Sequence, residues 1–282
     1  IGNIADMIVN DERKPRCIFI AGPTSSGKTT FANRLAIELE VLKKKTLILS
    51  LDNYYLPHSQ IPFDPESGQQ NFEVITALDL ELFKKDITAL INGEEVHLPK
   101  YDFGKGGHFA CETPTRITSD TMVIIEGIHG LNPQMWQHLG NIESFRIYIS
   151  AMNPLNIHSH LPMSTSDHRL IRRLIRDFLF RGYDFNETIS RWPDVMESEF
   201  NNIFPFQESA HIVFNSALLY EIAVFAHIAP TILKPEEAAN KTIQYHVERL
   251  NRLLSLFIGI NPNEIPPTSI LREFIGGSSF KY

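Results

Sequence analysis

The sequence predicts an α/β fold built on a parallel, doubly wound sheet. Two observations favour this fold: short apolar runs alternate with segments of helical periodicity, and glycines and acidic residues follow directly after several of the apolar runs. Parallel strands are buried on both faces, so they appear as continuous apolar runs rather than as alternating patterns. Because such sheets bind ligands at the carboxyl ends of their strands, we expect the functional residues to gather there.

The elements are expected in a regular order along the chain, which we treat as one domain of 282 residues. Helical periodicity and apolar runs alternate as strands and helices do in such folds. Two proline- and glycine-rich stretches, 56–71 and 100–118, are expected to be long loops on the substrate side. The expected strands are 17–21, 46–51, 122–125, 145–149 and 211–214, and the expected helices are 31–42, 78–91 and 167–182, with a helical region and a tail over 218–282.

The composition excludes several classes of protein. The net charge of -7 argues against a general nucleic-acid binder, which would carry excess Lys and Arg. No uninterrupted apolar stretch is long enough for a membrane helix, so we expect a cytoplasmic protein without membrane contact. The two cysteines, Cys17 and Cys111, suggest neither a disulfide framework nor a zinc site. The chain starts at Ile1, and 1–14 is expected to be the leading helix of a longer chain.

A glycine-rich loop directly follows the first expected strand and opens a helix. Its sequence fits GxxxxGK[ST], the Walker A pattern, in the context that confirms it. Successive backbone N–H groups and the helix N-terminus would cradle the phosphates of ATP. Lys28 would reach the β and γ phosphates, and the Thr29 hydroxyl would be a ligand of Mg²⁺. The expected phosphate-binding residues are Gly22, Pro23, Thr24, Ser25, Ser26, Gly27, Lys28, Thr29 and Thr30.

Two acidic residues follow expected strands. Asp52 lies just past the second strand, where a carboxylate can accept the proton of an attacking hydroxyl. Glu126 ends the third strand, the position of a carboxylate that binds Mg²⁺ directly or through water. A turn or helix-cap role is the simpler alternative for Asp52, and a strand-terminal acid without function is the alternative for Glu126.

The segment 167–182 predicts an amphipathic helix with a concentrated cationic stripe. Its four arginines recur at helical spacing, and apolar residues, among them Phe178, fall on the other side. Because arginine makes bidentate phosphate contacts, we interpret the segment as a lid over ATP, although a solvated face remains the alternative. The arginines are Arg169, Arg172, Arg173 and Arg176.

The remaining candidates are aromatic and histidine side chains. Tyr101, Phe103 and His108 lie in the glycine-rich stretch and could stack on a base or simply anchor a loop. The His158 and His160 pair lacks an obvious third metal ligand.

Taken together, these motifs resemble the uridine kinase and phosphoribulokinase family over residues 18–280. The resemblance is carried by the Walker A run and by segments that occur in the family's order. A bacterial-type subfamily is the most similar, and in it the kinase often follows a threonyl-tRNA-synthetase-like region. The segments are Ser50–Tyr55, Asn71–Glu73, Ala77–Asp79, Glu126–Ile128 and the arginine run of 167–177.

The resemblance implies a nucleoside monophosphate kinase-like, five-stranded P-loop fold with ATP and Mg²⁺ as cofactors. It implies that Asp52 is the catalytic base, that Glu73 holds the ribose hydroxyls and that Tyr101 belongs to the base pocket, with Tyr54 and His108 nearby. Where members of the family have a histidine in the base pocket, this chain has Gly106. Family members also tend to form homo-oligomers.

We therefore predict an ATP-dependent kinase that phosphorylates the 5′-hydroxyl of a uridine- or cytidine-like nucleoside. Lys28, Arg169, Arg173 and Arg176 would act on the transferring phosphoryl group, with Arg169 also near the acceptor. Two alternatives remain open: a kinase of another small alcohol, of the phosphoribulokinase or pantothenate kinase type, and an ATP-binding regulatory module without turnover.

Overall fold

The structure is a computed structural model that describes most of the chain. The described residues are 1–63, 68, 70–102, 106–137, 139–153, 156–158 and 161–281, without the side chains of 157, 158, 161 and 162. Phe103, His160 and the His158 side chain therefore lie outside the described part. The chain forms two compact units. Unit 1 comprises Ile1–Pro23, Phe31–Tyr148 and Ser198–Val213, and unit 2 comprises Thr24–Thr30, Ile149–Glu197 and Phe214–Tyr282.

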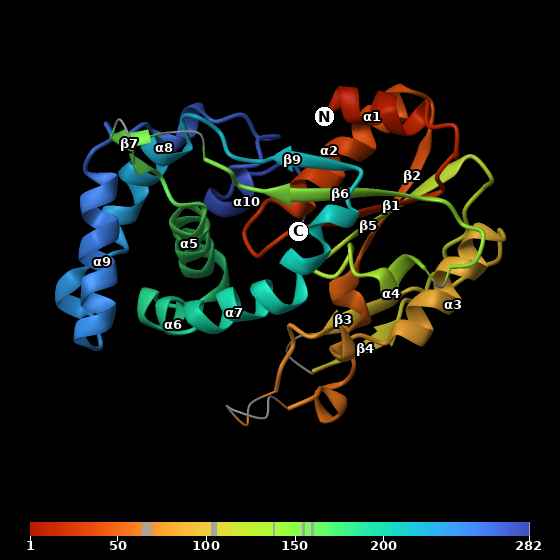
Figure 1. The fold of residues 1–282 in the computed structure, drawn as a ribbon, viewed down its shortest axis with the longest axis horizontal. Helices are drawn as coiled ribbons and strands as arrows, with labels where there is room; N and C mark the ends of the chain where they lie inside the picture. Colours follow the sequence, from red (N-terminus) through yellow and green to blue (C-terminus); the bar gives the residue numbers. More distant parts are fainter. Residues whose placement is uncertain are drawn as a thin grey trace. The chain divides into compact units, whose positions relative to one another are not determined.

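The central sheet has five parallel strands in the order β2-β5-β1-β6-β9, which confirms the predicted fold class (Figure 1). Each strand lies within one residue of its expected bounds at either end. β1 and β5 are fully buried, as continuous apolar runs predict. The strands are β1 (Cys17–Ala21), β2 (Lys45–Ser50), β5 (Thr121–Glu126), β6 (Ser144–Ser150) and β9 (Ile212–Asn215).

The strand register brings the functional ends of three strands level with one another. Glu126 at the end of β5 pairs with Ser50 of β2 on one side and with Ile20 of β1 on the other. The chain then continues from β1 into the Walker A loop and from β2 toward Asp52. Since all three strands are parallel, these segments leave the same edge of the sheet.

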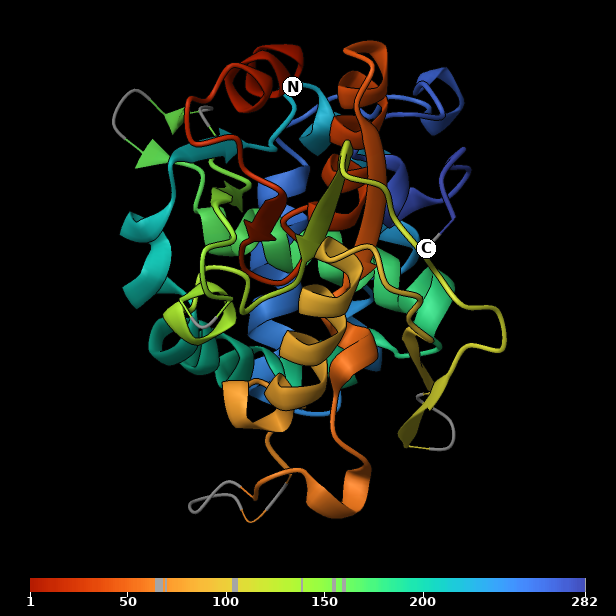
Figure 2. The same cartoon turned by 90° about the vertical axis from the view of Figure 1, so that its right-hand side faces the viewer.

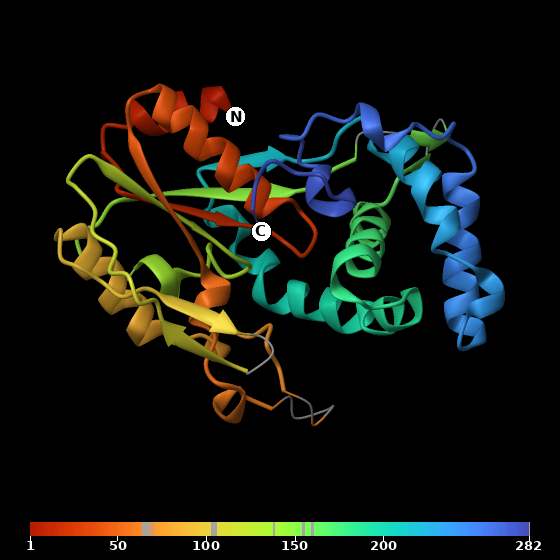
Figure 3. The same ribbon diagram turned by 180° about the vertical axis from the view of Figure 1, so that it is seen from behind.

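Helices cover both faces of the sheet in unit 1. Phe83 and Ile87 of α3 pack with Phe19 and Val123 of the strands, while α1 and α2 lie on the opposite face (Figures 1 and 3). The Asp79 side chain caps α3 by accepting from the Leu82 N–H at 2.9 Å. The helices are α1 (Gly2–Val9), α2 (Lys28–Val41, in unit 1 from Phe31), α3 (Leu80–Ile91) and α4 (Pro133–Trp136).

The stretch expected as a loop over 100–118 contains a β-hairpin instead, drawn in yellow in Figure 2. β3 (Pro99–Asp102) pairs antiparallel with β4 (Gly107–Ala110), and Tyr101 faces His108 in the register. Gly106 lies in a turn and Gly107 begins β4, and neither prevents the pairing of the two strands.

Unit 2 is mainly helical. A core of aliphatic and aromatic side chains joins α5, α6, α8, α9 and α10, and α5 contacts both α8 and α10. The region from Pro266 onward, expected to be an irregular tail, thus contributes a short helix to this core. The elements are β7 (Asn156–His158), β8 (Leu161–Pro162), α5 (Thr165–Arg176), α6 (Phe185–Ser190), α7 (Trp192–Asn202, which crosses the unit boundary), α8 (Glu221–Ile228), α9 (Lys241–Leu254) and α10 (Arg272–Ile275).

Within the described ranges, none of the helices has both the length and the apolar character needed to cross a bilayer.

Candidate functional site

The Walker A loop has the backbone geometry of a phosphate cradle. Ser25 and Gly27 adopt positive φ angles of 57° and 86°, and α2 begins at Lys28, so successive N–H groups turn toward the helix N-terminus. The Ser25 and Ser26 hydroxyls are buried and have no hydrogen-bond partner among the described residues. Positive φ in a non-glycine residue and orphaned buried hydroxyls both indicate a site built for a ligand. These residues fit the phosphates of ATP.

The other predicted cradle residues occupy consistent positions. Gly22 and Pro23 are buried at the end of β1 in unit 1, whereas Thr24 to Thr30 belong to unit 2. Lys28 and Thr29, in the first turn of α2, are half-buried, so their side chains are neither sequestered in the core nor fully in water. Thr30 is fully buried.

Two predicted lid arginines hold the backbone of this loop. In unit 2, Arg169 Nη1 donates to the Thr24 carbonyl at 3.1 Å, and Arg172 Nη1 donates to the Ser25 carbonyl at 3.1 Å. Arg169 is 2% exposed and Arg172 is 0% exposed. These guanidiniums bind two carbonyl oxygens of the loop and so hold its backbone in place. Arg169 and Arg172 are therefore buried, so the alternative of a solvated face is wrong for these two arginines.

Arg172 is neutralised by a carboxylate that the sequence did not point to. Glu221 of α8 accepts from Arg172 Nε at 2.5 Å and from Nη2 at 2.8 Å, and both side chains are completely buried. Burial alone would raise the pKa of Glu221, but Arg172 and the neighbouring His168 lower it to about 2. Burial lowers the pKa of His168, whose Nε2 lies 3.2 Å from Glu221 Oε1. A bidentate, buried pair of this kind fixes Arg172 in one position.

The other predicted lid arginines share one acidic partner. Asp177 lies 3.2 Å from Arg173 Nε and 3.0 Å from Arg176 Nη2, and both arginines remain partly exposed. The helix then continues as a π-helical turn over Asp177–Arg181, a feature that often occurs at functional sites. Phe178 in this turn is 47% exposed, which contradicts its expected place on an apolar, buried face.

The part of unit 1 around Asp52, Glu73 and Tyr101, which are predicted to bind the phosphoryl acceptor, is called the acceptor side. Asp52 lies there in a 3₁₀ turn (Leu51–Tyr54) directly after β2. The Ser50 side chain accepts from the Asp52 N–H at 3.4 Å and caps this turn. Asp52 is exposed, and Gly127 packs against Leu51, where an added Cβ would approach the leucine side chain to 2.7 Å. Close packing at Leu51 thus holds the start of the turn, while the Asp52 residue remains exposed.

Tyr55, which was not predicted, is the centre of this side. Burial raises the pKa of Tyr55 well above its ordinary value, and the nearby carboxylates of Asp52 and Glu73 raise it further. Its ring contacts Phe72 and Tyr101 edge to face, with centroids 5.9 Å apart in both pairs. Asp52, Glu73 and Tyr101 are therefore brought together around one buried ring. The one signal in the sequence for Tyr55 is its position directly after Tyr54, which was predicted to bind substrate.

Tyr54 does not belong to the acceptor side. Its hydroxyl donates to Asp86 of α3 at 3.3 Å, its ring packs on Phe83, and the residue is 1% exposed. Because a side chain committed to the core cannot contact a substrate, the predicted substrate-binding role of Tyr54 is wrong. Tyr54 ends the 3₁₀ turn whereas Tyr55 after it is extended, so the two neighbouring rings meet different partners.

The two histidines of this region differ from expectation as well. His108 Nδ1 lies 3.0 Å from the Tyr55 carbonyl oxygen, so its ring serves the local backbone. His58 lies beside Gly106, and a Cβ added to Gly106 would come within 2.6 Å of the His58 ring. The same ring contacts Phe72, with the two centroids 5.3 Å apart. The imidazole next to the aromatic cluster is therefore His58, which sequence reasoning missed.

Glu126 and His129 complete the sheet edge of unit 1. Glu126 is 6% exposed and ends β5 between β1 and β2. His129, three residues later, is 1% exposed, and neither ring nitrogen has a hydrogen-bond partner among the described residues. Burial lowers the pKa of His129 to about 4. No group of three His, Cys, Asp or Glu side chains suited to a metal occurs in the described ranges. Mg²⁺ prefers oxygen ligands, so the carboxylate of Glu126 in unit 1 and the hydroxyl of Thr29 in unit 2 each have the chemistry of a ligand for it.

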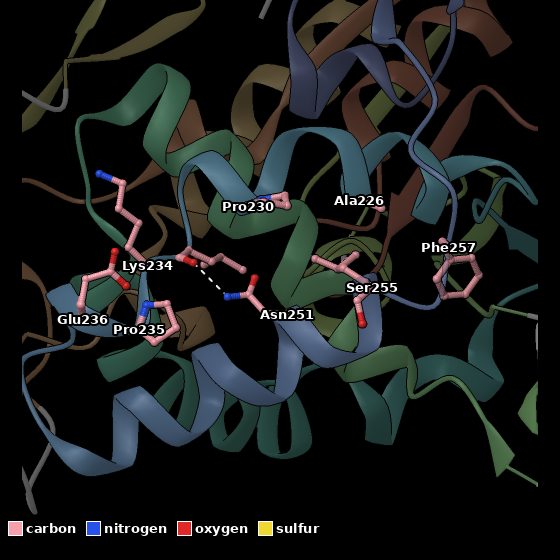
Figure 4. A pocket seen from close by; sticks show the side chains of 10 residues that line it. Ala226, Pro230, Lys234, Pro235, Glu236, Asn251, Ser255 and Phe257 are labelled. Atoms are coloured by element: carbon pink, nitrogen blue, oxygen red, sulfur yellow. Dashed lines mark hydrogen bonds between the residues drawn. The ribbon is translucent and has the colours of Figure 1, made fainter.

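A cavity of about 470 Å³ lies elsewhere in unit 2, beside α8 and α9 (Figure 4). The Asn251 amide in its wall donates to the Leu233 carbonyl at 2.9 Å. None of the predicted site residues lines it. Its lining consists of Ala226, Pro230, Leu233, Lys234, Pro235, Glu236, Asn251, Leu254, Ser255 and Phe257.

Comparison with known proteins places this site in a family. The chain is 29% identical over 202 residues to a uridine kinase of Geobacillus kaustophilus (strain HTA426), covering 71% of this chain and 86% of the relative. It is 30% identical over 177 residues to uridine-cytidine kinase C of Dictyostelium discoideum, covering 63% of this chain and 33% of the relative.

Among solved structures, a proposed fructose transport system kinase from Silicibacter sp. TM1040 matches with a TM-score of 0.50 and 18% identity, covering 76% of this chain and 98% of that one, which supports the fold alone. The sequence profile of the Phosphoribulokinase / Uridine kinase family matches residues 17–223. The chain therefore belongs to the phosphoribulokinase and uridine kinase family and is an ATP-dependent kinase.

Proposed function

We propose that this kinase transfers the γ-phosphoryl group of ATP to the 5′-hydroxyl of a nucleoside. The observation that carries the proposal is the acceptor side of unit 1, where the carboxylates of Asp52 and Glu73 both lie near enough to the buried Tyr55 to raise its pKa. That ring also contacts Phe72 and Tyr101. Two carboxylates beside an aromatic cluster suit a neutral molecule with several hydroxyls and an aromatic ring.

In this proposal each acidic residue has one task. Asp52, exposed and adjacent to β2, accepts the proton of the attacking 5′-hydroxyl. Glu73 accepts hydrogen bonds from the 2′- and 3′-hydroxyls, and the Asn71 side chain fixes the turn before it by accepting from the Glu73 N–H at 3.0 Å. Two negative charges in one place disfavour an acceptor that already carries a phosphate.

The phosphate side is proposed to work through positioning and charge. Lys28 neutralises the β and γ phosphates, and the loop amides, held by Arg169 and Arg172 through the Thr24 and Ser25 carbonyls, receive the remaining phosphate oxygens. Mg²⁺ bound by Thr29 and Glu126 would neutralise charge on the phosphates. Phosphoryl transfer needs little covalent chemistry from the protein, so orientation and electrostatic stabilisation supply most of the rate.

The lid arginines have a smaller proposed role than the sequence suggested. Arg173 and Arg176 share Asp177 and keep part of their surface in solvent. Both are proposed to contact the transferring phosphoryl group, because the planar guanidinium of arginine makes bidentate contacts with phosphate oxygens.

The acceptor is tested by measuring ADP release from MgATP with a panel of ribonucleosides, 2′-deoxyribonucleosides, pantothenate and ribulose 5-phosphate. The proposal expects turnover with a ribonucleoside and a much lower kcat/KM for its deoxy analogue. Turnover with pantothenate or ribulose 5-phosphate in place of the nucleosides would assign the site to another alcohol. ATP binding without turnover on any of them would contradict a catalytic role.

A further inference from the structure

A segment outside the family match makes three contacts with the nucleotide-binding loop, the start of the helix after it and the arginine that holds the loop. The family profile ends at residue 223, yet residues 270–274 of unit 2 pack on the Walker A loop and on the arginine that holds it. Ile270 lies so close to Gly27 that an added Cβ would come within 2.6 Å of its Cγ2 atom. Phe274 lies under the Arg172 guanidinium, 4.7 Å from the ring centroid. The third contact is made by Glu273.

Glu273 binds the first turn of the Walker A helix directly. One carboxylate oxygen, Oε2, accepts from the Thr30 hydroxyl at 2.6 Å and from the Thr30 N–H at 3.1 Å. Thr30 is the third residue of α2, and N–H groups in the first turn of a helix have no partner within the helix. A carboxylate at this position also interacts favourably with the helix dipole. Glu273 thus caps α2 from a position 243 residues away in the chain.

The short helix that carries Glu273 is itself firmly held. Leu271 and Phe274 are completely buried in the core of unit 2. Arg272 donates to the carbonyls of Pro262, Ile265 and Gly276 at 3.0, 3.1 and 3.2 Å. The carboxylate therefore extends from a fixed backbone, which makes it a stationary acceptor rather than a mobile surface group.

We propose that residues 270–274 are part of the nucleotide-binding machinery and that Glu273 is a positioning residue acting through Thr30. By fixing the start of α2, it holds the preceding loop amides in the arrangement that receives phosphate, so less ordering is required when nucleotide binds. Ile270 supports the same loop at Gly27, whose φ of 86° excludes most other residues. This inference rests on the nucleotide half of the proposed function and is independent of the acceptor.

The test is the dissociation constant of MgATP, measured by calorimetry on the full chain without any acceptor. Glu273→Ala should raise it on the order of tenfold, because a charged hydrogen-bond partner and a helix cap are both lost. Glu273→Gln keeps an acceptor for Thr30 and should restore most of the affinity. The matched control is Glu264→Ala, since Glu264 is exposed in the preceding 3₁₀ turn and should leave the constant unchanged.

Two further readouts separate positioning from general destabilisation. With saturating MgATP, the KM for the acceptor should stay within about twofold in Glu273→Ala. In a Thr30→Val background the effect of Glu273→Ala on the MgATP dissociation constant should shrink, because the two residues are coupled.

Unchanged or tighter MgATP binding by Glu273→Ala would overturn the inference, and tighter binding would mean that the carboxylate competes with phosphate. A wild-type protein that does not bind MgATP would contradict the nucleotide half of the proposed function together with this inference.

Discussion

The phosphate-binding loop and the acceptor side use charged residues in opposite ways. In unit 2, the Arg172 and Glu221 side chains that hold the loop are 0% exposed and fully paired. In unit 1, Asp52 is exposed and Glu73 is partly exposed, both near a buried aromatic ring. Charges that support a backbone are thus sequestered, whereas charges proposed to act on a substrate remain accessible. The difference predicts that substitutions in the first set change stability and those in the second change turnover.

The largest effect on stability is expected at Glu221. Glu221→Ala leaves the buried Arg172 without its partner and should lower the free energy of unfolding by about 3–5 kcal/mol. Urea denaturation followed by circular dichroism measures this loss. Glu237→Gln is the control, because Glu237 pairs with Lys234 at 2.9 Å on the surface and should matter by less than about 1 kcal/mol. A small loss at Glu221 would show that Arg172 does not depend on it.

Acid should act on His129 and on Glu221 in different pH ranges. The pKa of His129 in the folded protein is about 4, below its ordinary value of 6.5. The neutral ring therefore contributes about 3 kcal/mol to the free energy of unfolding above pH 6.5, and this contribution is lost as the pH falls toward 4. Glu221, lowered from 4.5 to about 2, loses its contribution only between those values. Unfolding curves at stepwise pH should therefore show an earlier loss that His129→Asn removes. His227→Asn is the control, and an unaltered profile in His129→Asn would refute the assignment.

A smaller effect is expected at Glu73 and should depend on the substrate. Glu73→Gln weakens the acceptor for two ribose hydroxyls, so the KM for a ribonucleoside should rise about tenfold. The KM for the 2′-deoxy analogue should change less, because one of the two hydrogen bonds is already absent. Steady-state kinetics with both acceptors checks this. An equal rise for both nucleosides would remove Glu73 from ribose recognition, and the unfolding free energy should stay unchanged.

The smallest effect is expected at Tyr54. Tyr54→Phe removes the hydrogen bond to Asp86 and should cost about 1 kcal/mol of stability with kcat and KM unchanged. Thermal melting and steady-state kinetics on the same preparation measure both. A kinetic defect without a stability change would return Tyr54 to the acceptor side.

The sequence was sufficient for the sheet and for the loop that follows it. Apolar runs such as Cys17–Ala21 and the glycine pattern after them depend on local residue order, which a sequence displays directly. The two carboxylates were likewise predictable because strand ends determine their position. Tyr54 and Tyr55 show the limit of this approach, since the motif contains both, both rings are buried, and only the fold determines which partners each ring meets.

Long-range contacts were not predictable. The periodicity of α5 placed four arginines on one face, but Arg172 is buried because Glu221 and Ser216, far along the chain, supply its partners. The same reason hid Glu273, which lies in a region that was expected to be irregular and that binds Thr30 across 243 residues. A helical pattern shows which residues share a face but not which charged partners are folded against it.

The measurement that tests the account most directly is the rate of ADP release from MgATP with the best ribonucleoside acceptor, compared between the wild-type protein and Asp52→Asn. The account predicts a kcat lower by about 10²–10⁴-fold in the variant, with MgATP affinity and the unfolding free energy unchanged. A variant that turns over at nearly the wild-type rate would contradict the role of Asp52 as the base and the proposed acceptor side with it.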